Sequence, residues 1–245
     1  MIQKDQPSNF PPDVIVALSS RVDGTMLDRS INIHDDSVMN NRIAFCRQSG
    51  LDYDNVVYQA IVYGDTQTYD SIVTVGHKQT TAFKADINAD ALFTKTPGVG
   101  LFLPVADCVA TVVYDPTNKY LAMVHLGRDS TVAQLMQKTI EMFISEGSNP
   151  TDLVIWMSPS AKQQTYVMQW FDHESDSLWQ EFIQKTEQGL HLDLPEFNNA
   201  SAIRTGVLAE NIHISPINTM VSDDYFSHSM GDVRGRFAVV ASMVI

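Results

Sequence analysis

The chain has 245 residues, of which 44% are hydrophobic and 18% charged, so it holds enough apolar material for a packed core. Its 29 acidic and 16 basic residues give a net charge of −13, which repels the phosphates of nucleic acids and of anionic membranes. The start of the chain lacks the apolar run of a signal peptide, and no stretch approaches the roughly 18 apolar residues of a membrane span. We therefore expect a cytoplasmic protein with neither a nucleic-acid nor a membrane partner; its oligomeric state is not predicted.

The chain is predicted to form a single domain. No repeat or low-complexity tract interrupts residues 1–245, and Pro and Gly are scattered along them. Residues 1–12 are polar and contain three prolines, so they are expected to form a loose N-terminal segment. The two cysteines, Cys46 and Cys108, do not resemble a disulfide framework.

The first half of the chain is predicted to be rich in strands. Residues 14–19 are an apolar run typical of a buried strand, and a helix is expected from Asp35–Asp36 to Gln48. Alternating or β-branched residues predict further strands over 55–63, 71–75, 91–94, 99–104, 110–114 and 120–125.

The second half adds helices to the predicted strands. Helices are expected from Asp129 or Ser130 to about Ser145, and over about 173–188 and 195–210; strands are expected over 153–157, 211–214 and 237–245. The order is not a repeating βαβ pattern. It favours an α/β fold with mixed sheets over a doubly wound parallel sheet.

One predicted hairpin carries two residues whose side chains can take part in catalysis or bind a metal. Cys108 opens its first strand and His125 closes its second, and the turn at 115–118 lies midway, so antiparallel pairing brings the two together at one end of a sheet. A thiol beside an imidazole suits a nucleophile–base pair or a metal site. His77 follows another strand and is a candidate third ligand for a catalytic zinc. Spacing alone leaves these alternatives open, because single His and Cys residues are usually structural.

In the segments around His77, Cys108 and His125 the chain resembles the laccase-domain family, also called multicopper polyphenol oxidases. Members of this family are similar to bacterial purine nucleoside phosphorylases. The most specific matching segments are Thr96-Pro97-Gly98-Val99 and Ala106-Asp107-Cys108. The others run in the same order along nearly the whole chain: Ser20-Arg21 with Gly24, Asp35-Asp36, Asn41-Arg42, His77, Ala89-Asp90-Ala91-Leu92, His125 with Gly127, Phe226-Ser227-His228 and Gly235-Arg236.

The resemblance implies a mixed-sheet, four-layer α-β-β-α sandwich with Zn²⁺ on His77, Cys108 and His125. It also implies phosphorolysis of purine nucleosides, in some members together with adenosine deamination, for which zinc supplies an activated water. Purine nucleoside and phosphate are the expected small-molecule partners, with Arg21, Arg128 and His228 as candidate substrate- and phosphate-binding residues. Copper is less expected, because a multicopper laccase needs about ten imidazoles and the chain has seven histidines.

The chain departs from the family pattern directly after His125. Where the family usually has His-Ala-Gly-Trp-Arg-Gly, residues 125–130 read His-Leu-Gly-Arg-Asp-Ser. Asp129 takes the place of a basic residue and would repel phosphate, whereas Arg128 can restore the charge one position earlier. Two other functions therefore stay open: a metal-free cysteine hydrolase with Cys108 as nucleophile and His125 as base, and a small-molecule binding protein without catalysis.

Overall fold

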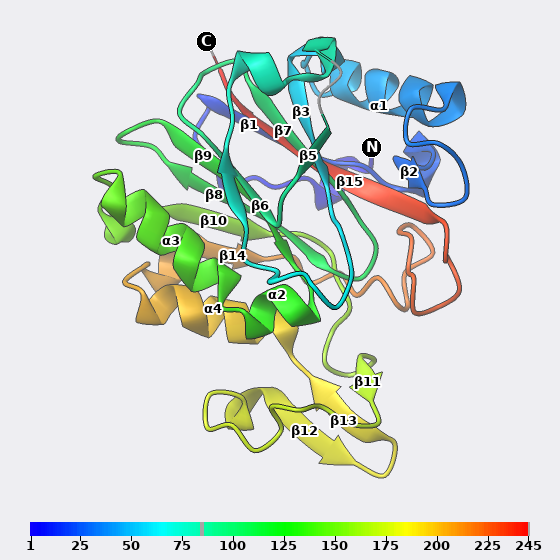
Figure 1. Cartoon of the computed structure of the whole chain (residues 1–245), viewed down its shortest axis with the longest axis vertical. Helices are drawn as coiled ribbons and strands as arrows, with labels where there is room; N and C mark the ends of the chain where they lie inside the picture. The colour runs from blue at the N-terminus through cyan, green and yellow to red at the C-terminus, as the bar shows by residue number, and fades with distance from the viewer. Residues whose placement is uncertain (84–85, 245) are drawn as a thin grey trace.

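Two six-stranded sheets lie face to face at the centre of the molecule in the computed structural model, which describes residues 1–83 and 86–244 (Figure 1). The order in sheet one is β1 (Val14–Leu18), β15 (Gly235–Met243), β7 (Gly100–Val105), β3 (Val56–Ala60) and β5 (Asp86–Asn88), with β2 (Leu27–Asp28) also beside β15. The order in sheet two is β14 (Ile212–Ile214), β10 (Val154–Met157), β8 (Val109–Asp115), β9 (Tyr120–Leu126), β6 (Ala91–Thr94) and β4 (Ile72–Thr74).

Both sheets are mixed, as the order of predicted elements indicates. Strand β3 is parallel to β5 and β7, β4 is parallel to β6, and β10 is parallel to β14. The remaining pairs are antiparallel, including the β8–β9 hairpin whose turn follows Asp115. The Asp115 carboxylate accepts hydrogen bonds from the backbone N–H groups of Thr117 and Asn118, which explains the sharp turn at this point.

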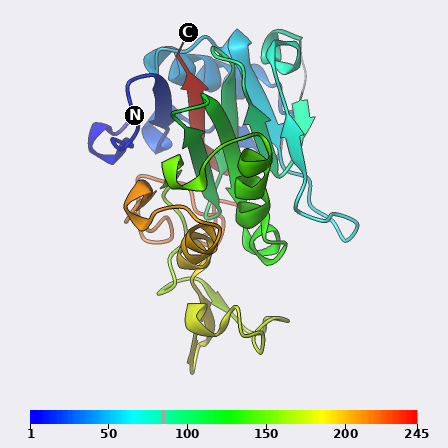
Figure 2. The ribbon, with the colours of Figure 1, turned by 90° about the vertical axis from the view of Figure 1, so that its left-hand side faces the viewer.

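Helices cover the outer face of each sheet and complete the four layers. Helix α1 (Asp36–Gln48) packs on sheet one, while α3 (Leu135–Ser145) and α4 (Leu194–Arg204) lie over sheet two beside the short α2 (Arg128–Val132) (Figures 1 and 2). In β8, Ala110, Val112 and Tyr114 face sheet one, whereas Val109 and Val113 face the helices. A strand buried on both faces needs apolar residues at nearly every position, which explains the continuous run in this segment.

Two of the three helices predicted in the second half form, but with other boundaries. The helix expected over 129–145 is divided into α2 and α3, because Gln134 adopts a left-handed conformation with φ of 60°. The helix expected over 195–210 ends at Arg204, and Gly206 follows with φ of 104°.

The helix expected over 173–188 is absent from the described chain and its prediction was wrong. This segment belongs to a third sheet of β11 (Val167–Met168), β13 (Gly189–Leu192) and β12 (Ile183–Thr186), which projects from the stacked sheets (Figure 2). Its aromatic residues pack as a cluster rather than along a helix face: the ring of Trp179 stacks on Phe197 of α4 at 4.0 Å. Tertiary packing therefore overrides the local helical preference.

The N-terminal segment is fastened to the body, so the prediction of a loose segment over 1–12 was wrong. The Gln6 side chain exchanges two hydrogen bonds of 2.9 Å with the backbone of Leu18. The Tyr225 hydroxyl donates to the Asp5 carboxylate. None of the helices within 1–83 and 86–244 has the length and apolar character that a membrane crossing requires.

Single-turn 3-10 helices lie at Gln3–Asp5, Arg21–Asp23, Tyr53–Asn55, His77–Gln79, Thr81–Phe83, Pro150–Asp152, Gln180–Phe182 and Ala209–Asn211.

Candidate functional site

Cys108 and His125 meet at one end of the β8–β9 hairpin, as their spacing predicts. The strand register pairs Ala110 with His125, which places Cys108 opposite Gly127. A Cβ atom at Gly127 would lie 3.2 Å from the Sγ of Cys108 and 3.3 Å from the Cε1 of His125. Both side chains therefore border the space above Gly127.

Burial keeps this pair uncharged. His125 is 3% exposed, and within the described residues its Nδ1 has no hydrogen-bond partner. Burial lowers the pKa of His125 to about 4, against the opposing charges of Asp90 and Asp129. Burial also raises the pKa of the Cys108 thiol to about 12, with Asp107 adding to the rise and Arg236 opposing it. At neutral pH the site holds a thiol and a neutral imidazole, rather than the thiolate of a cysteine hydrolase.

Asp107 fixes the turn that delivers Cys108 from sheet one to sheet two. Its backbone adopts a left-handed conformation with φ of 73°, which is costly for a residue other than glycine. The carboxylate accepts hydrogen bonds of 2.7 Å from the Thr219 hydroxyl and from the Ser229 N–H. These bonds hold the strained turn in place, so Asp107 acts as a positioning residue for Cys108.

His77 lies at the opposite end of sheet two from His125. The Val75 N–H donates to the Phe93 carbonyl, and a Cβ at Gly76 would lie 3.6 Å from the Thr96 hydroxyl. The His125 N–H instead donates to the carbonyl of Asp90. Six residues of extended strand separate Asp90 from Thr96, which is a span of roughly 20 Å. His77 is exposed there and does not reach Cys108 or His125.

The three-residue zinc set expected from the sequence therefore does not fit this structure. A catalytic zinc takes three protein ligands. Over residues 1–83 and 86–244, no group of three or more His, Cys, Asp or Glu side chains is arranged to hold a metal ion. Cys108 and His125 offer a thiol and an unpaired imidazole nitrogen, which are two donors of suitable chemistry. Because the third is missing, we assign no chemical step to zinc.

Two predicted phosphate-binding arginines are already paired with carboxylates. The Arg21 guanidinium forms an ion pair with Asp232, and it stacks 4.5 Å from the ring centroid of Phe226. The Nε of Arg128 lies 2.9 Å from the Oδ1 of Asp129. Each pairing offsets the positive charge that would attract an anion.

The third predicted substrate residue, His228, is exposed on the loop after Phe226. Its neighbour Ser229 reaches the site through the hydrogen bond to Asp107.

The structure reveals another pair of arginines that the sequence reasoning missed. Arg29 and Arg236 line a pocket of about 110 Å³ together with Tyr63. The edge of the Tyr63 ring lies against His125 at 6.3 Å between centroids, and the Arg29 guanidinium is 5.4 Å from the Tyr63 centroid. This pocket therefore adjoins the Cys108–His125 pair.

Neither arginine has a carboxylate partner among the described residues. Arg236 is only 7% exposed, and its guanidinium donates to the backbone carbonyls of Asp232 and Gly235. Burial lowers the pKa of Arg236, and the charge of Arg29 lowers it further. The sequence signals Arg236 through the matching segment Gly235-Arg236, but nothing in it links Arg236 to Arg29, 207 positions earlier (236 − 29).

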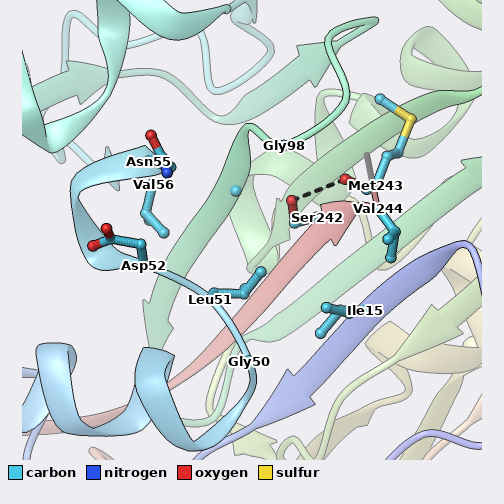
Figure 3. Close-up of a pocket in the computed structure, with 11 residues that line it drawn as sticks. Ile15, Gly50, Leu51, Asp52, Asn55, Val56, Gly98, Ser242, Met243 and Val244 are labelled. Atoms are coloured by element: carbon cyan, nitrogen blue, oxygen red, sulfur yellow. Dashed lines mark hydrogen bonds between the residues drawn. The ribbon is translucent and has the colours of Figure 1, made fainter.

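A different pocket lies at the other end of β15. Figure 3 shows this cavity of about 270 Å³, bordered by Asp52, Asn55 and Ser242. Arg236 begins β15, whereas Ser242 lies close to its end. The lining described for this pocket contains none of the predicted site residues, and it includes Asp52 as its charged side chain.

Curated relatives carry names of nucleoside enzymes. The chain is 31% identical to the purine nucleoside phosphorylase of Bacteroides thetaiotaomicron over 156 residues, which are 60% of this chain and 58% of that protein, less than two thirds of its length. It is 27% identical to purine nucleoside phosphorylase YlmD of Bacillus subtilis, covering 82% of this chain and 76% of that one. It is 26% identical to adenosine deaminase RL5 of an unknown prokaryotic organism, covering 78% of each.

Solved structures share the fold. The YlmD protein of Geobacillus stearothermophilus superimposes with a TM-score of 0.81 at 21% identity, covering 98% of this chain and 94% of that one. The YfiH protein of Bacillus licheniformis gives a TM-score of 0.80 at 23% identity, covering 94% and 92%. A family model described as multi-copper polyphenol oxidoreductase laccase matches residues 20–244, which include the Cys108–His125 site and every strand of both sheets except β1. On the evidence of this match, the chain belongs to the laccase-domain family that its sequence resembles.

Proposed function

We propose that the chain cleaves purine nucleosides with phosphate, at the place where Cys108, His125 and Tyr63 meet. The observation that carries this proposal is the pocket of Arg29 and Arg236, two guanidinium groups without a carboxylate partner in the described structure. The names of the relatives support the same class of substrate.

The charges around this pocket favour a bound anion. Two like charges face one small cavity in a protein whose net charge is −13, and the Arg236 side chain is nearly inaccessible to water. Arg29 is exposed and solvated, so the cost of burial falls on Arg236, and an anion that joins the two guanidinium groups offsets it. Guanidinium groups bind phosphate oxygens through paired N–H donors, so phosphate satisfies the site.

The uncharged state of Cys108 and His125 is compatible with such an anion. A thiolate beside the pocket would repel phosphate, whereas a protonated thiol does not. The pKa directions of both groups keep them neutral at physiological pH. They therefore border the site without competing for the arginines.

The proposed reaction is a displacement at the sugar. An oxygen of hydrogen phosphate forms a bond to C1′ while the bond from C1′ to the purine nitrogen breaks. The electron pair of that bond stays on the nitrogen, which receives the proton of hydrogen phosphate. The products are the free purine and ribose 1-phosphate. Positioning two reactants together supplies a large part of such a rate enhancement. No step is assigned to a metal, because His77 lies away from the other two predicted ligands.

Turnover of adenosine, inosine and guanosine with and without phosphate tests the proposal, with the sugar product identified by ³¹P NMR. We expect release of the base to require phosphate and to give ribose 1-phosphate. An Arg29→Met/Arg236→Met double variant prepared in parallel should lose this activity, which excludes a contaminating phosphorylase. Free ribose formed at an unchanged rate without phosphate, ammonia released from adenosine without base cleavage, or no turnover of any nucleoside would each contradict it.

A further inference from the structure

A further pocket, of about 300 Å³, lies where α2 faces the third sheet. Arg128 and Asp129 form one wall, and Tyr69, Trp170 and Phe171 contribute aromatic side chains. Arg128 follows Gly127 directly, and a Cβ at Gly127 would meet both Cys108 and His125. A molecule in this pocket therefore lies close to the proposed reaction centre.

The aromatic side chains of this pocket differ in exposure: Phe171 is 6% exposed and packs in the core cluster of Trp179, whereas Trp170 is presented for contact. Trp170 is 66% exposed, whereas the other two tryptophans, Trp156 and Trp179, are 5% and 1% exposed. Tryptophan side chains are seldom this exposed to solvent. A tryptophan that is exposed and also borders a cavity indicates a binding site.

The ring of Tyr69 is held in place. Its hydroxyl donates to the Gly64 carbonyl and accepts a hydrogen bond of 3.0 Å from the Gly64 N–H. Tyr69 itself has a left-handed backbone with φ of 57°, a conformation that its surroundings must maintain. Flat, fixed aromatic rings suit a flat heterocycle, because base–aromatic stacking requires no particular edge.

The polar groups of the pocket select among heterocycles. Asp129 and Asp172 line it, and an ionised carboxylate only accepts hydrogen bonds. The positive charge of Arg128 is already paired with Asp129. The pocket therefore favours a neutral ring that carries N–H donors for the free carboxylate oxygens of Asp129 and Asp172. Adenine offers its 6-amino group, whereas hypoxanthine presents an acceptor oxygen at the same position.

We infer that this pocket holds the nucleobase, stacked on Trp170, and that it favours a 6-aminopurine over a 6-oxopurine. The inference rests on the proposed function, since it assigns the base of the proposed nucleoside to one pocket and the phosphate to the other. Trp170, Asp129 and Asp172 are then specificity-determining residues.

Binding of free adenine and hypoxanthine, measured by calorimetry and by tryptophan fluorescence, tests this assignment directly. Because Trp170 is the exposed tryptophan, saturable quenching by adenine is expected in the wild type. Trp170→Ala should weaken adenine binding at least tenfold, in line with the loss of one stacking contact. Trp170→Phe should retain most of it. Leu178→Ala is a matched control, because Leu178 is exposed on the same projecting segment outside the pocket.

The carboxylates are tested separately. Asp129→Asn and Asp172→Asn should each reduce the preference for adenine over hypoxanthine several-fold, because an amide can also donate to the oxygen of hypoxanthine. Equal binding of adenine to the wild type and to Trp170→Ala, or equal binding of the two bases to the wild type, would overturn the inference. Adenine binding that depends on Trp170, without nucleoside cleavage, would support this pocket while contradicting the proposed reaction. Nucleoside cleavage that is unaffected by Trp170→Ala would support the proposed reaction and contradict the assignment of the base to this pocket.

Discussion

Gly127 lies directly opposite Cys108 across the β8–β9 hairpin, and a side-chain carbon at this position would lie close to both site residues. The added Cβ of Gly127→Ala would lie 3.2 Å from the thiol sulfur and 3.3 Å from the imidazole, closer than side chains normally approach. The backbone of Gly127 has φ of −92°, which alanine adopts without strain. We therefore expect folding to be preserved while kcat/KM falls about ten- to hundredfold, because small displacements of reacting groups are costly.

Gly76→Ala is the matched control for this variant. Its Cβ would meet its nearest atom at 3.6 Å, an ordinary contact distance. Both variants should show similar thermal unfolding, and only Gly127→Ala should lose activity. Full activity in Gly127→Ala would mean that the space beside Cys108 and His125 is not used by substrate.

The sequence predicts the region around this pair well because its signals are local. An apolar strand, an Asp-Pro-Thr-Asn turn and a second apolar strand determine a hairpin, and the hairpin register determines where Cys108 and His125 lie. The four layers follow from the family resemblance, since apolar runs alone do not reveal which helices cover which sheet. The helix expected over 173–188 failed because Trp179 and Phe182 pack against Phe197, a tertiary contact that local periodicity does not contain.

The rest of the site depends on contacts between distant segments. His77 resembled a ligand because it follows a strand, but β4 is parallel to β6 and therefore carries His77 away from His125. The pairing of Arg21 with Asp232 and the shared pocket of Arg29 and Arg236 also join the two ends of the chain. A single sequence shows which arginines exist, but not which of them lack a carboxylate partner.

Asp107 should matter for stability and for activity together. Asp107→Ala removes the acceptor for Thr219 and Ser229 and leaves a side chain that tolerates a positive φ poorly. We expect the free energy of unfolding to fall by about 2 kcal/mol, the usual effect of losing hydrogen bonds to a buried charged group. Asp107→Asn should lose less, because asparagine adopts this backbone conformation and retains an acceptor. Urea unfolding measures both; equal stability of Asp107→Ala and the wild type would refute the positioning role.

The location of His77 makes a prediction about metal content. Any zinc carried by the purified protein should survive the substitution His77→Ala and disappear in Cys108→Ala, because only Cys108 lies beside His125. Elemental analysis of the two variants, purified without added metal, makes this comparison. Loss of zinc from His77→Ala would show that the three-residue set forms after all, and that the arrangement of β4 differs from the one described.

Lys162 gives a prediction for alkaline pH. Its ammonium group donates to the Ser215 carbonyl at 2.7 Å, and burial lowers its pKa from 10.5 to about 8. Between pH 8 and 10.5 the unfolded chain therefore binds more protons at this residue than the folded chain does, so raising the pH stabilises the fold through Lys162. The stability of the wild type minus that of Lys162→Met should increase over this range in chemical denaturation. A constant or falling difference would show that the folded and unfolded pKa values are equal or reversed.

The most direct test of the phosphate site compares Arg236→Met with Arg21→Met. Both substitutions remove one guanidinium group, but Arg236 lacks a carboxylate partner in the described structure whereas Arg21 is paired with Asp232. We predict that the KM for phosphate rises at least tenfold in Arg236→Met and changes less than twofold in Arg21→Met, with nucleoside KM little affected in either. A rise confined to Arg21→Met would place the phosphate at the residue first suggested by the sequence, and it would contradict the assignment to Arg29 and Arg236.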